Sequence, residues 1–163
     1  MKQSIAGVAP AETSEVTIMT VWPTLGASGA GRFLGRLFMI RWGIGILTLG
    51  KVFAALSIPV ALGLYFAKIM PFSGQCYRLT NRRVVIETIY RRAVQSWVEL
   101  DRFDTIEVLV QPGQDWYRAG DLVFRQGQIE TFRLMGVSRP ESFKHTCLDA
   151  RRGYVGVRAA MSR

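Results

Sequence analysis

The sequence predicts an α+β fold, in which a small antiparallel β-sandwich or barrel is closed by a C-terminal helix and preceded by an N-terminal membrane anchor. Three observations support this fold class. Residues 52–67 contain no charge, as is typical of a membrane segment. From about residue 75, apolar residues recur at every second position, which is the period of a half-buried strand. After residue 138, an apolar stripe with helical spacing follows.

These changes of pattern divide the 163 residues into four regions. We expect a flexible N-terminal tail over 1–30, the membrane anchor over 31–70, the β-rich domain over 75–155 and a C-terminal tail over 156–163. The N-terminal region mixes small residues with little periodicity, and it does not begin with the charged and apolar regions of a cleaved signal peptide.

The net charge is +9, and its distribution bears on the partners. Residues 32–70 carry five basic and no acidic residues, which favours the anionic cytoplasmic leaflet of a membrane. The β-rich region alternates in sign and shows no basic stripe with interleaved aromatic residues, so we expect no nucleic-acid partner. The mean hydropathy of +0.17 fits a membrane segment joined to a water-soluble domain.

The anchor contains one clear candidate span. Residues 52–70 can cross about 30 Å of hydrocarbon if Lys51 and Lys68 extend their charged ends outward. Pro59 would kink a helix in water but is tolerated within a bilayer span. This segment is therefore predicted to be a transmembrane helix.

The preceding residues, 31–50, form an amphipathic pattern. Arg32, Arg36 and Arg41 recur at four and five positions, so they share one side of a helix that is otherwise largely apolar. This pattern is typical of a helix in the headgroup region, and the alternative is an amphipathic helix packed on the protein itself. The residues expected at the membrane interface are Arg32, Arg36, Arg41, Trp42 and Lys68.

Two arrangements of the anchor remain open: one span with an interfacial helix, or a two-helix hairpin. The hairpin would place both basic flanks on the same side, as the positive-inside rule prefers. However, only nine uncharged residues run from Trp42 to Gly50, which makes a first span short. In both arrangements the β-rich domain is expected to face the cytoplasm from the inner membrane.

The β-rich region divides into six expected strands. They are residues 76–80, 83–90, 94–100, 104–110, 119–125 and 129–134. Tight turns are expected at 80–82 and 125–128, where Asn81 and Gly127 can adopt positive φ, and a longer loop opens at Gln111. Short alternating strands separated by turn signals predict a small sandwich or barrel.

The last element is a helix. Ser138 and Glu141 have the spacing of a capping box, with Pro140 in the first turn. An apolar stripe follows at Phe143, Cys147, Ala150 and Tyr154. Gly153 marks the position where the helix is expected to fray or end.

In this order the elements resemble the bacterial pleckstrin-homology (PH) domain family of membrane-attached proteins. The similarity covers about residues 50–155, and it is carried by YRLTNRRVVI (77–86), VELDRF (98–103), IEV (106–108), GDLVF (120–124) and GVSRPE (136–141). The resemblance implies a sheet closed by a C-terminal helix and a membrane-tethered interaction module, but no single activity. Family members commonly have two clear spans, whereas the first one here is short and interrupted by arginines.

The hairpin next to the anchor is the first candidate binding site. Arg78, Arg82 and Arg83 follow the anchor so closely that they lie within about a Debye length of the headgroups. They are candidate lipid-binding residues that could hold an anionic headgroup. The alternative is a solvated hairpin whose charge only signals membrane topology.

A second candidate site is the loop at Trp116, Tyr117 and Arg118. Neighbouring aromatic residues in a loop are typical of a protein-binding hot spot, and the alternative is that they cap the open end of the barrel. The turn from Asp101 to Asp104 is either a recognition loop or a set of locally paired charges.

The chain shows no catalytic constellation. Asp101 and Asp104 lack a histidine partner or a glycine-rich phosphate loop, and His145 is expected on the solvent side of the last helix. Cys76 and Cys147 are expected to be free thiols, and no metal site or cofactor is expected.

We therefore expect a non-catalytic, membrane-tethered scaffold or adaptor whose partners are membrane lipid and an unidentified protein, with a homo-oligomer as an open possibility. A domain that binds anionic lipid headgroups and a regulatory subunit of a membrane complex are the alternatives.

Overall fold

The computed structural model describes residues 15–40, 43–44, 47–69, 74–89 and 91–161, and for 43–44, 47–48 and 67–69 it describes the backbone alone. The strands are β1 (Thr17–Val21), β2 (Gly43–Ile44), β3 (Leu47–Thr48), β4 (Gln75–Thr80), β5 (Arg83–Thr88), β6 (Val94–Glu99), β7 (Thr105–Leu109), β8 (Ala119–Gln126) and β9 (Ile129–Ser138). The helices are α1 (Gly29–Phe38), α2 (Leu49–Leu56), α3 (Ile58–Ile69) and α4 (Pro140–Met161), with short 3-10 turns η1 (Leu25–Ala27) and η2 (Asp115–Tyr117).

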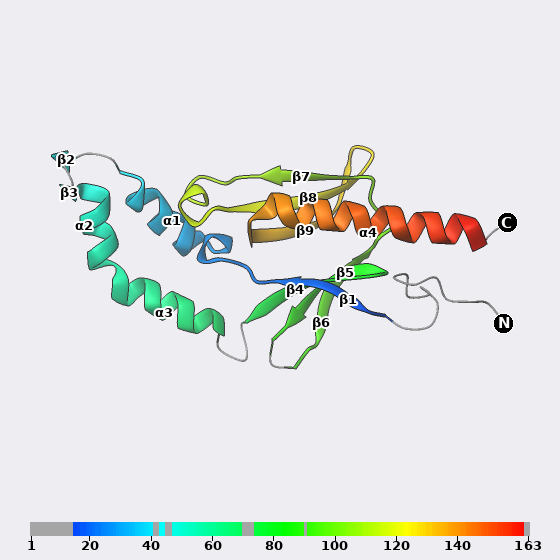
Figure 1. Cartoon of the computed structure of the whole chain (residues 1–163). Helices are drawn as coiled ribbons and strands as arrows, with labels where there is room; N and C mark the ends of the chain where they lie inside the picture. The colour runs from blue at the N-terminus through cyan, green and yellow to red at the C-terminus, as the bar shows by residue number, and fades with distance from the viewer. Residues whose placement is uncertain (1–14, 41–42, 45–46, 70–73, 90, 162–163) are drawn as a thin grey trace.

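Two antiparallel sheets and the C-terminal helix α4 form the body of the molecule (Figure 1). The first sheet has the strand order β1-β4-β5-β6, and the second has the order β7-β8-β9. The predicted α+β class with a closing C-terminal helix is therefore confirmed. The sheets are separate, however, so the fold is not a closed barrel.

The core lies between the two sheets and α4. It is built from the inward positions of the alternating strands, such as Leu79 and Val84 in the first sheet and Leu122 and Phe124 in the second. Phe143 of α4 is fully buried among them. Alternate residues such as Leu122 and Phe124 thus face the core, while β8 is buried at all six positions from Ala119 to Phe124.

The first strand of the four-stranded sheet comes from the region expected to be a flexible tail. β1 pairs with β4 antiparallel, with Thr20 opposite Arg78 and Val21 opposite Tyr77. The expectation for 1–30 is thus wrong from Thr17 onward, and residues 1–14 lie outside the described residues. Only Val21 of this strand is buried, which explains why its pattern is weak.

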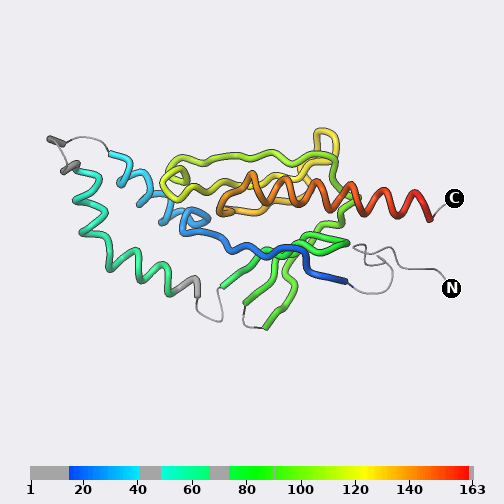
Figure 2. The backbone as a smooth tube through the Cα atoms, viewed as in Figure 1, coloured from blue at the N-terminus to red at the C-terminus, as the bar shows by residue number. Residues whose placement is uncertain are grey.

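Residues 22–74 form a long insertion between the paired strands β1 and β4. In Figures 1 and 2 the chain leaves β1, runs outward through α1, and returns through α2 and α3 to β4. The blue strand β1 nevertheless lies beside the green strands of the same sheet. This insertion, with both ends on one sheet, positions the candidate site described below.

Three local expectations are wrong at the turns and ends. Asn81 does not have positive φ; its side-chain oxygen accepts a hydrogen bond from the Val16 amide at 3.0 Å. Ser138 is the last residue of β9 and not a helix cap. α4 continues through Gly153 to Met161, so residues 156–161 are helix and not tail. A glycine inside a helix costs only about 1 kcal/mol, too little to end a long one.

Candidate functional site

The insertion exposes an unusual apolar surface on α2 and α3, which together we call the arch. Its exposed large apolar side chains are Leu49, Val52, Phe53, Leu56, Ile58, Val60, Leu62, Tyr65 and Phe66. Leu56 is 71% exposed, and the intervening residues are mostly alanine and glycine. A helix that is apolar on nearly every side is stable only when something other than water covers it. The described chain covers little of the arch.

The arch bends between its two helices. Ser57 separates α2 from α3, and their axes differ by 53°. Pro59 accounts for the bend because it has no N–H for the preceding turn and its ring collides with the backbone there. Among the described residues, no single helix is long and apolar enough to cross a membrane, while Leu49–Leu56 and Ile58–Phe66 together could do so by length and composition.

The first end of the arch is fixed to α1. The Gly50 amide donates to the Ile40 carbonyl at 3.0 Å. A Cβ on Gly50 would lie 2.5 Å from the carbonyl oxygens of both Phe38 and Ile40, so the two backbones are in direct contact. The position of the arch therefore depends on the position of α1.

α1 in turn is packed on the loop that precedes β8. A Cβ on Gly35 would lie 2.0 Å from the Gly113 carbonyl oxygen, and one on Gly113 would lie 2.1 Å from the Arg32 carbonyl oxygen. The Arg36 guanidinium donates to the Pro112 carbonyl at 3.2 Å. This helix was expected in the headgroups, but its glycine face is used against the protein, which is the alternative that the sequence left open.

The predicted aromatic site holds this helix. The Tyr117 hydroxyl donates to the Gly31 carbonyl at 3.0 Å, and burial raises its pKa. Trp116 packs edge-on against Phe38, with ring centroids 5.3 Å apart, and remains 48% exposed. Arg118 adopts a left-handed backbone and accepts a hydrogen bond from the Arg139 amide through its carbonyl. The loop thus binds the chain's own α1, and binding of another protein there stays a prediction.

A buried polar cluster supports the same junction. Gln114 is fully buried and donates through Nε2 to Asp121 Oδ1 at 2.7 Å and to the Gly26 carbonyl at 3.2 Å. Asp121 Oδ1 also accepts from the Gly136 amide at 2.8 Å. The Gly136 carbonyl accepts from both the amide and the hydroxyl of Thr24. These bonds tie the segment before α1 to the second sheet.

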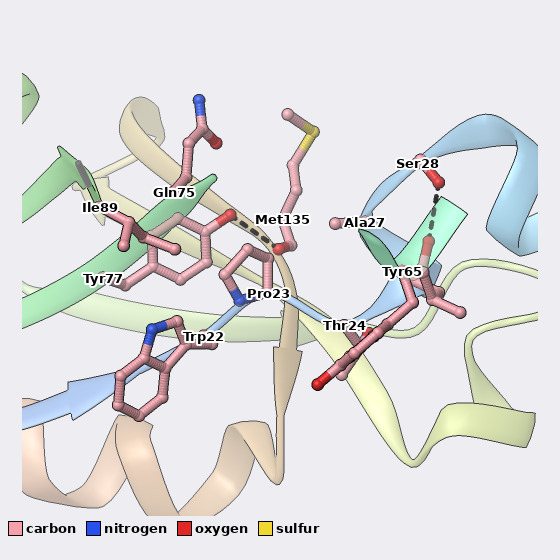
Figure 3. A pocket seen from close by; sticks show the side chains of 11 residues that line it. Trp22, Pro23, Thr24, Ala27, Ser28, Tyr65, Gln75, Tyr77, Ile89 and Met135 are labelled. Atoms are coloured by element: carbon pink, nitrogen blue, oxygen red, sulfur yellow. Dashed lines mark hydrogen bonds between the residues drawn. The ribbon is translucent and has the colours of Figure 1, made fainter. Parts of the chain in front are cut away.

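A cavity of about 550 Å³ lies at the foot of the arch (Figure 3). Tyr65 of α3 lines one side, and Trp22, Ile89 and Met135 line others; none of its eleven lining residues is charged. At its floor the Tyr77 hydroxyl donates to the Met135 carbonyl at 2.9 Å, and burial raises the pKa of Tyr77 to about 12. This hydroxyl is thus already bonded, and the cavity extends the apolar surface of the arch to the sheets.

Two of the predicted lipid-binding arginines already have acidic partners. Arg78 forms an ion pair with Glu87, a carboxylate only 5% exposed. Arg83 donates to both oxygens of Glu15 at 2.7 and 2.8 Å, and its guanidinium lies 5.9 Å from the Trp97 ring centre. These bonds hold the pKa of Glu15 below its ordinary value.

Arg82 shares a groove of about 490 Å³ with Arg83. Trp97 also lines this groove, as do Tyr154 and Arg158 of α4. The three arginines therefore do not form one open cluster, because Arg78 is engaged separately with Glu87.

The turn from Asp101 to Asp104 is held by α4. Arg158 pairs with Asp101, and Arg151 bonds to Asp104 at 3.2 Å and to the Phe103 carbonyl at 2.6 Å. The predicted local pairing holds only for Arg102, which lies 3.8 Å from Glu99, and it is wrong for Asp101 and Asp104, whose partners come from α4. In the described part of the chain, no group of three or more His, Cys, Asp or Glu residues could hold a metal ion.

The remaining predicted interface residues are only partly placed. Arg32 and Arg36 lie on α1, as described above, and Lys68 belongs to α3. Arg41 and Trp42 lie outside the described residues. The sequence did not reveal that Glu15 pairs with Arg83 or that Gln114 is buried. For the contact between α1 and the loop before β8, the available signal was the pair of glycines at 35 and 113, which permits two backbones to approach closely.

No protein-family model matches this chain, and neither a curated protein nor a solved structure does.

Proposed function

We propose that the chain is a non-catalytic, membrane-attached interaction module. In this proposal the arch lies in the inner membrane, and the two-sheet body serves on the cytoplasmic side as a scaffold or adaptor for a protein partner. The observation that carries it is the arch itself, whose nine large apolar side chains are exposed on a chain with a separate, well-formed core. An apolar helical surface of this kind is stable when lipid surrounds it.

The free energy gained by burying the exposed apolar side chains of the arch supports lipid as the medium that surrounds it. Full burial of a large apolar side chain is worth about 1.5–3 kcal/mol, and roughly half of each arch side chain is exposed. Nine such residues give on the order of 10 kcal/mol. Each basic residue near an anionic surface adds only about 1 kcal/mol. Attachment should therefore depend on the apolar arch more than on charge.

The side of the membrane follows from the basic residues. Between 32 and 70 the chain has five basic residues and no acid. Basic flanks are retained on the cytoplasmic face, whose lipids are also more anionic. We therefore assign the body of the molecule to the cytoplasm.

The body fits a PH-like module in the order of its elements. A four-stranded antiparallel sheet is followed by a three-stranded one and then by a C-terminal helix. The arch is inserted between the first and second strands of the first sheet. The order from β4 to α4 is the one expected from the resemblance at residues 77–141, whereas β1 precedes the arch and was not part of it. This order supports interaction as the role of the body, without naming the partner.

Headgroup recognition is the less favoured role. An anionic lipid would have to displace Glu87 from Arg78 and Glu15 from Arg83 before either guanidinium became available. Leaving the nearly buried Glu87 without its partner is costly. A protein partner that uses other surfaces of the body does not require this exchange.

Vesicle flotation of the full chain tests the proposal. We expect the wild type to float with neutral and anionic vesicles at low and high salt, and Leu62→Asp combined with Val60→Asp to abolish flotation. Ile129→Asp is the matched control, because Ile129 is 72% exposed but lies at the start of β9, away from the arch. Flotation of the doubly substituted arch would contradict attachment through the arch. Binding that requires anionic lipid and is lost in high salt or on Arg78→Ala and Arg83→Ala would favour headgroup recognition.

A further inference from the structure

We propose that the arch enters and leaves the membrane on the same side, so that it lies within one leaflet and does not cross the bilayer. This inference rests on the proposed function, because it specifies how the arch meets the lipid. It replaces both arrangements that composition alone leaves open, the single span and the two-helix hairpin, and it follows from contacts on both sides of the arch.

The strands that flank the arch belong to one sheet. β1 precedes the arch and β4 follows it, yet Thr20 lies opposite Arg78 and Val21 opposite Tyr77. Strands paired in this way are about 5 Å apart. A single span would separate them by about 30 Å of hydrocarbon. The pairing of β1 with β4 is therefore incompatible with one crossing between them.

The helix before the arch cannot supply a second span. α1 is only ten residues long, and its Gly31, Leu34 and Gly35 are buried. The Tyr117 hydroxyl bonds the Gly31 carbonyl, and the backbone of Gly35 meets that of Gly113. Withdrawing α1 into lipid would break these contacts and expose the loop that holds it.

The arch is also too short to reach the far side and return. At 1.5 Å per residue, the eight residues of α2 extend about 12 Å and the twelve of α3 about 18 Å. A hairpin through both leaflets needs about 20 helical residues in each direction. The bend of 53° at Ser57 instead joins two short helices, of which α2 begins beside the outer end of α1 and α3 leads back to β4.

Aromatic residues mark the level of the membrane surface. Trp22 and Tyr65 are 58% and 53% exposed and both line the cavity at the foot of the arch, one from the connection after β1 and one from α3 (Figure 3). Tryptophan and tyrosine prefer the boundary between hydrocarbon and water. The cavity mouth would therefore lie at the headgroups of the near leaflet, with Leu56 and Ile58 of the bend deeper.

Cysteine labelling of the full chain in bacterial cells tests the topology. The native thiols are removed by Cys76→Ser and Cys147→Ala, and single reporters are introduced by Thr17→Cys on β1, Gln95→Cys on β6 and Leu56→Cys at the bend. A membrane-impermeant maleimide is applied to spheroplasts, which expose the outer face, and to inverted vesicles, which expose the cytoplasmic face. We expect both flanking reporters to react in inverted vesicles alone, and the bend reporter to react in neither preparation until detergent is added.

Other results separate the two proposals. Reaction of the flanking reporters in opposite preparations, or of the bend reporter in spheroplasts, would overturn insertion into one leaflet while leaving membrane attachment intact. Recovery of the chain in the soluble fraction, with the bend reporter reactive without detergent, would overturn the proposed function itself. Wild-type thermal stability of each reporter variant in detergent is the control for folding.

Discussion

Gly35 and Gly113 let two backbones meet where side chains would collide. Gly113 also has φ of +93°, a conformation that favours glycine. Because α1 carries the first end of the arch through Gly50, these two residues determine where the apolar surface lies relative to the body. The position of the arch therefore depends on two residues that have no side chain.

Gly35→Ala tests this contact. The new Cβ would lie 2.0 Å from the Gly113 carbonyl oxygen, so α1 must move. We expect a loss of about 1–3 kcal/mol, measured by denaturation of the full chain in detergent, together with a shift in Trp116 fluorescence as Phe38 withdraws. Gly29→Ala is the control, because a Cβ on this residue of the same helix would have no atom within 4 Å. Equal stability of the two variants would contradict the docking of α1.

Asp121 is the centre of the buried polar cluster. Replacing it with leucine removes the acceptor for Gln114 Nε2 and the Gly136 amide and leaves both donors buried. We expect Asp121→Leu to lower the free energy of unfolding by about 2–4 kcal/mol. Asp149→Leu should change it by less than about 0.5 kcal/mol, since Asp149 is exposed on α4. A similar small effect at both sites would show that the cluster contributes little.

The Glu15–Arg83 pair should make stability depend on pH. The hydrogen bonds from Arg83 lower the pKa of Glu15 from 4.5, and partial burial opposes this shift. The folded chain therefore binds this proton less tightly than the unfolded chain. The pair stabilises the fold above pH 4.5 and stops doing so as the pH falls through the lowered pKa.

Thermal unfolding of Glu15→Gln measures this contribution. We expect the variant to melt below the wild type at neutral pH, by an amount worth less than about 1 kcal/mol because the pair is partly exposed. The two melting temperatures should converge as the pH falls below 4.5. A difference that persists unchanged in acid would mean that Glu15 acts through packing and not through its charge.

Among the elements, α4 joins the two sheets most directly. Its Phe143 and Cys147 are fully buried, and its Arg151 and Arg158 hold the turn after β6. Burial also raises the pKa of the Cys147 thiol, which keeps it protonated and unreactive. The helix thus closes the core with its buried residues and fixes the connection between the sheets with its two arginines.

Gly153→Ala tests how far this helix extends. Gly153 has no positive φ and open space around its Cβ position, so alanine fits without strain. We expect a gain of about 0.5–1 kcal/mol in the free energy of unfolding, because alanine favours the helix more strongly. Gly127→Ala, at a turn with φ of +60°, should instead lose stability. No gain at Gly153 would indicate that the helix ends there, as the sequence alone suggested.

Over the whole molecule, local patterns predicted the elements and failed where partners are distant in sequence. The strands from β4 to β9 were predicted because their apolar residues and the turns that separate them lie close together in the sequence, although β8 is buried at six successive positions. β1 was missed because its pairing partner lies beyond the entire arch, and only Val21 is buried. The amphipathic pattern of α1 was recognised, but it cannot distinguish a face toward lipid from a face toward protein.

The candidate site shows the same limit. The apolar run at 52–67 was visible in the sequence and recurs in the arch, but the single helix expected over 52–70 is wrong, because two helices meet beside Pro59 at 53°. The arginines at 78 and 83 were visible too, but not their ion pairs. Glu15 lies 68 positions from Arg83, and Glu87, only nine positions from Arg78, meets it through the pairing of β4 with β5. A cluster of basic residues in a sequence therefore predicts a binding site only when the positions of its acidic partners in the fold are known.

Replacing the arch should leave the body intact. Since β1 and β4 are adjacent strands, a Gly/Ser linker of about ten residues in place of 49–69 changes loop-closure entropy by less than about 1 kcal/mol. We expect this variant to remain in solution without detergent and to lose flotation with vesicles. Amide exchange should still protect the Val21 and Tyr77 region. Loss of that protection would show that the arch is required for the sheet to form.

The pairing of β1 with β4 also sets an order of events during synthesis. β1 is made first, but its partner follows roughly 50 residues later, which corresponds to about 3–10 s at 5–20 residues per second. During that delay the ribosome makes the insertion, which includes α1 and the apolar arch. The arch is therefore available to a membrane before the sheet can close, and closure of the sheet then retains whatever position the arch has taken.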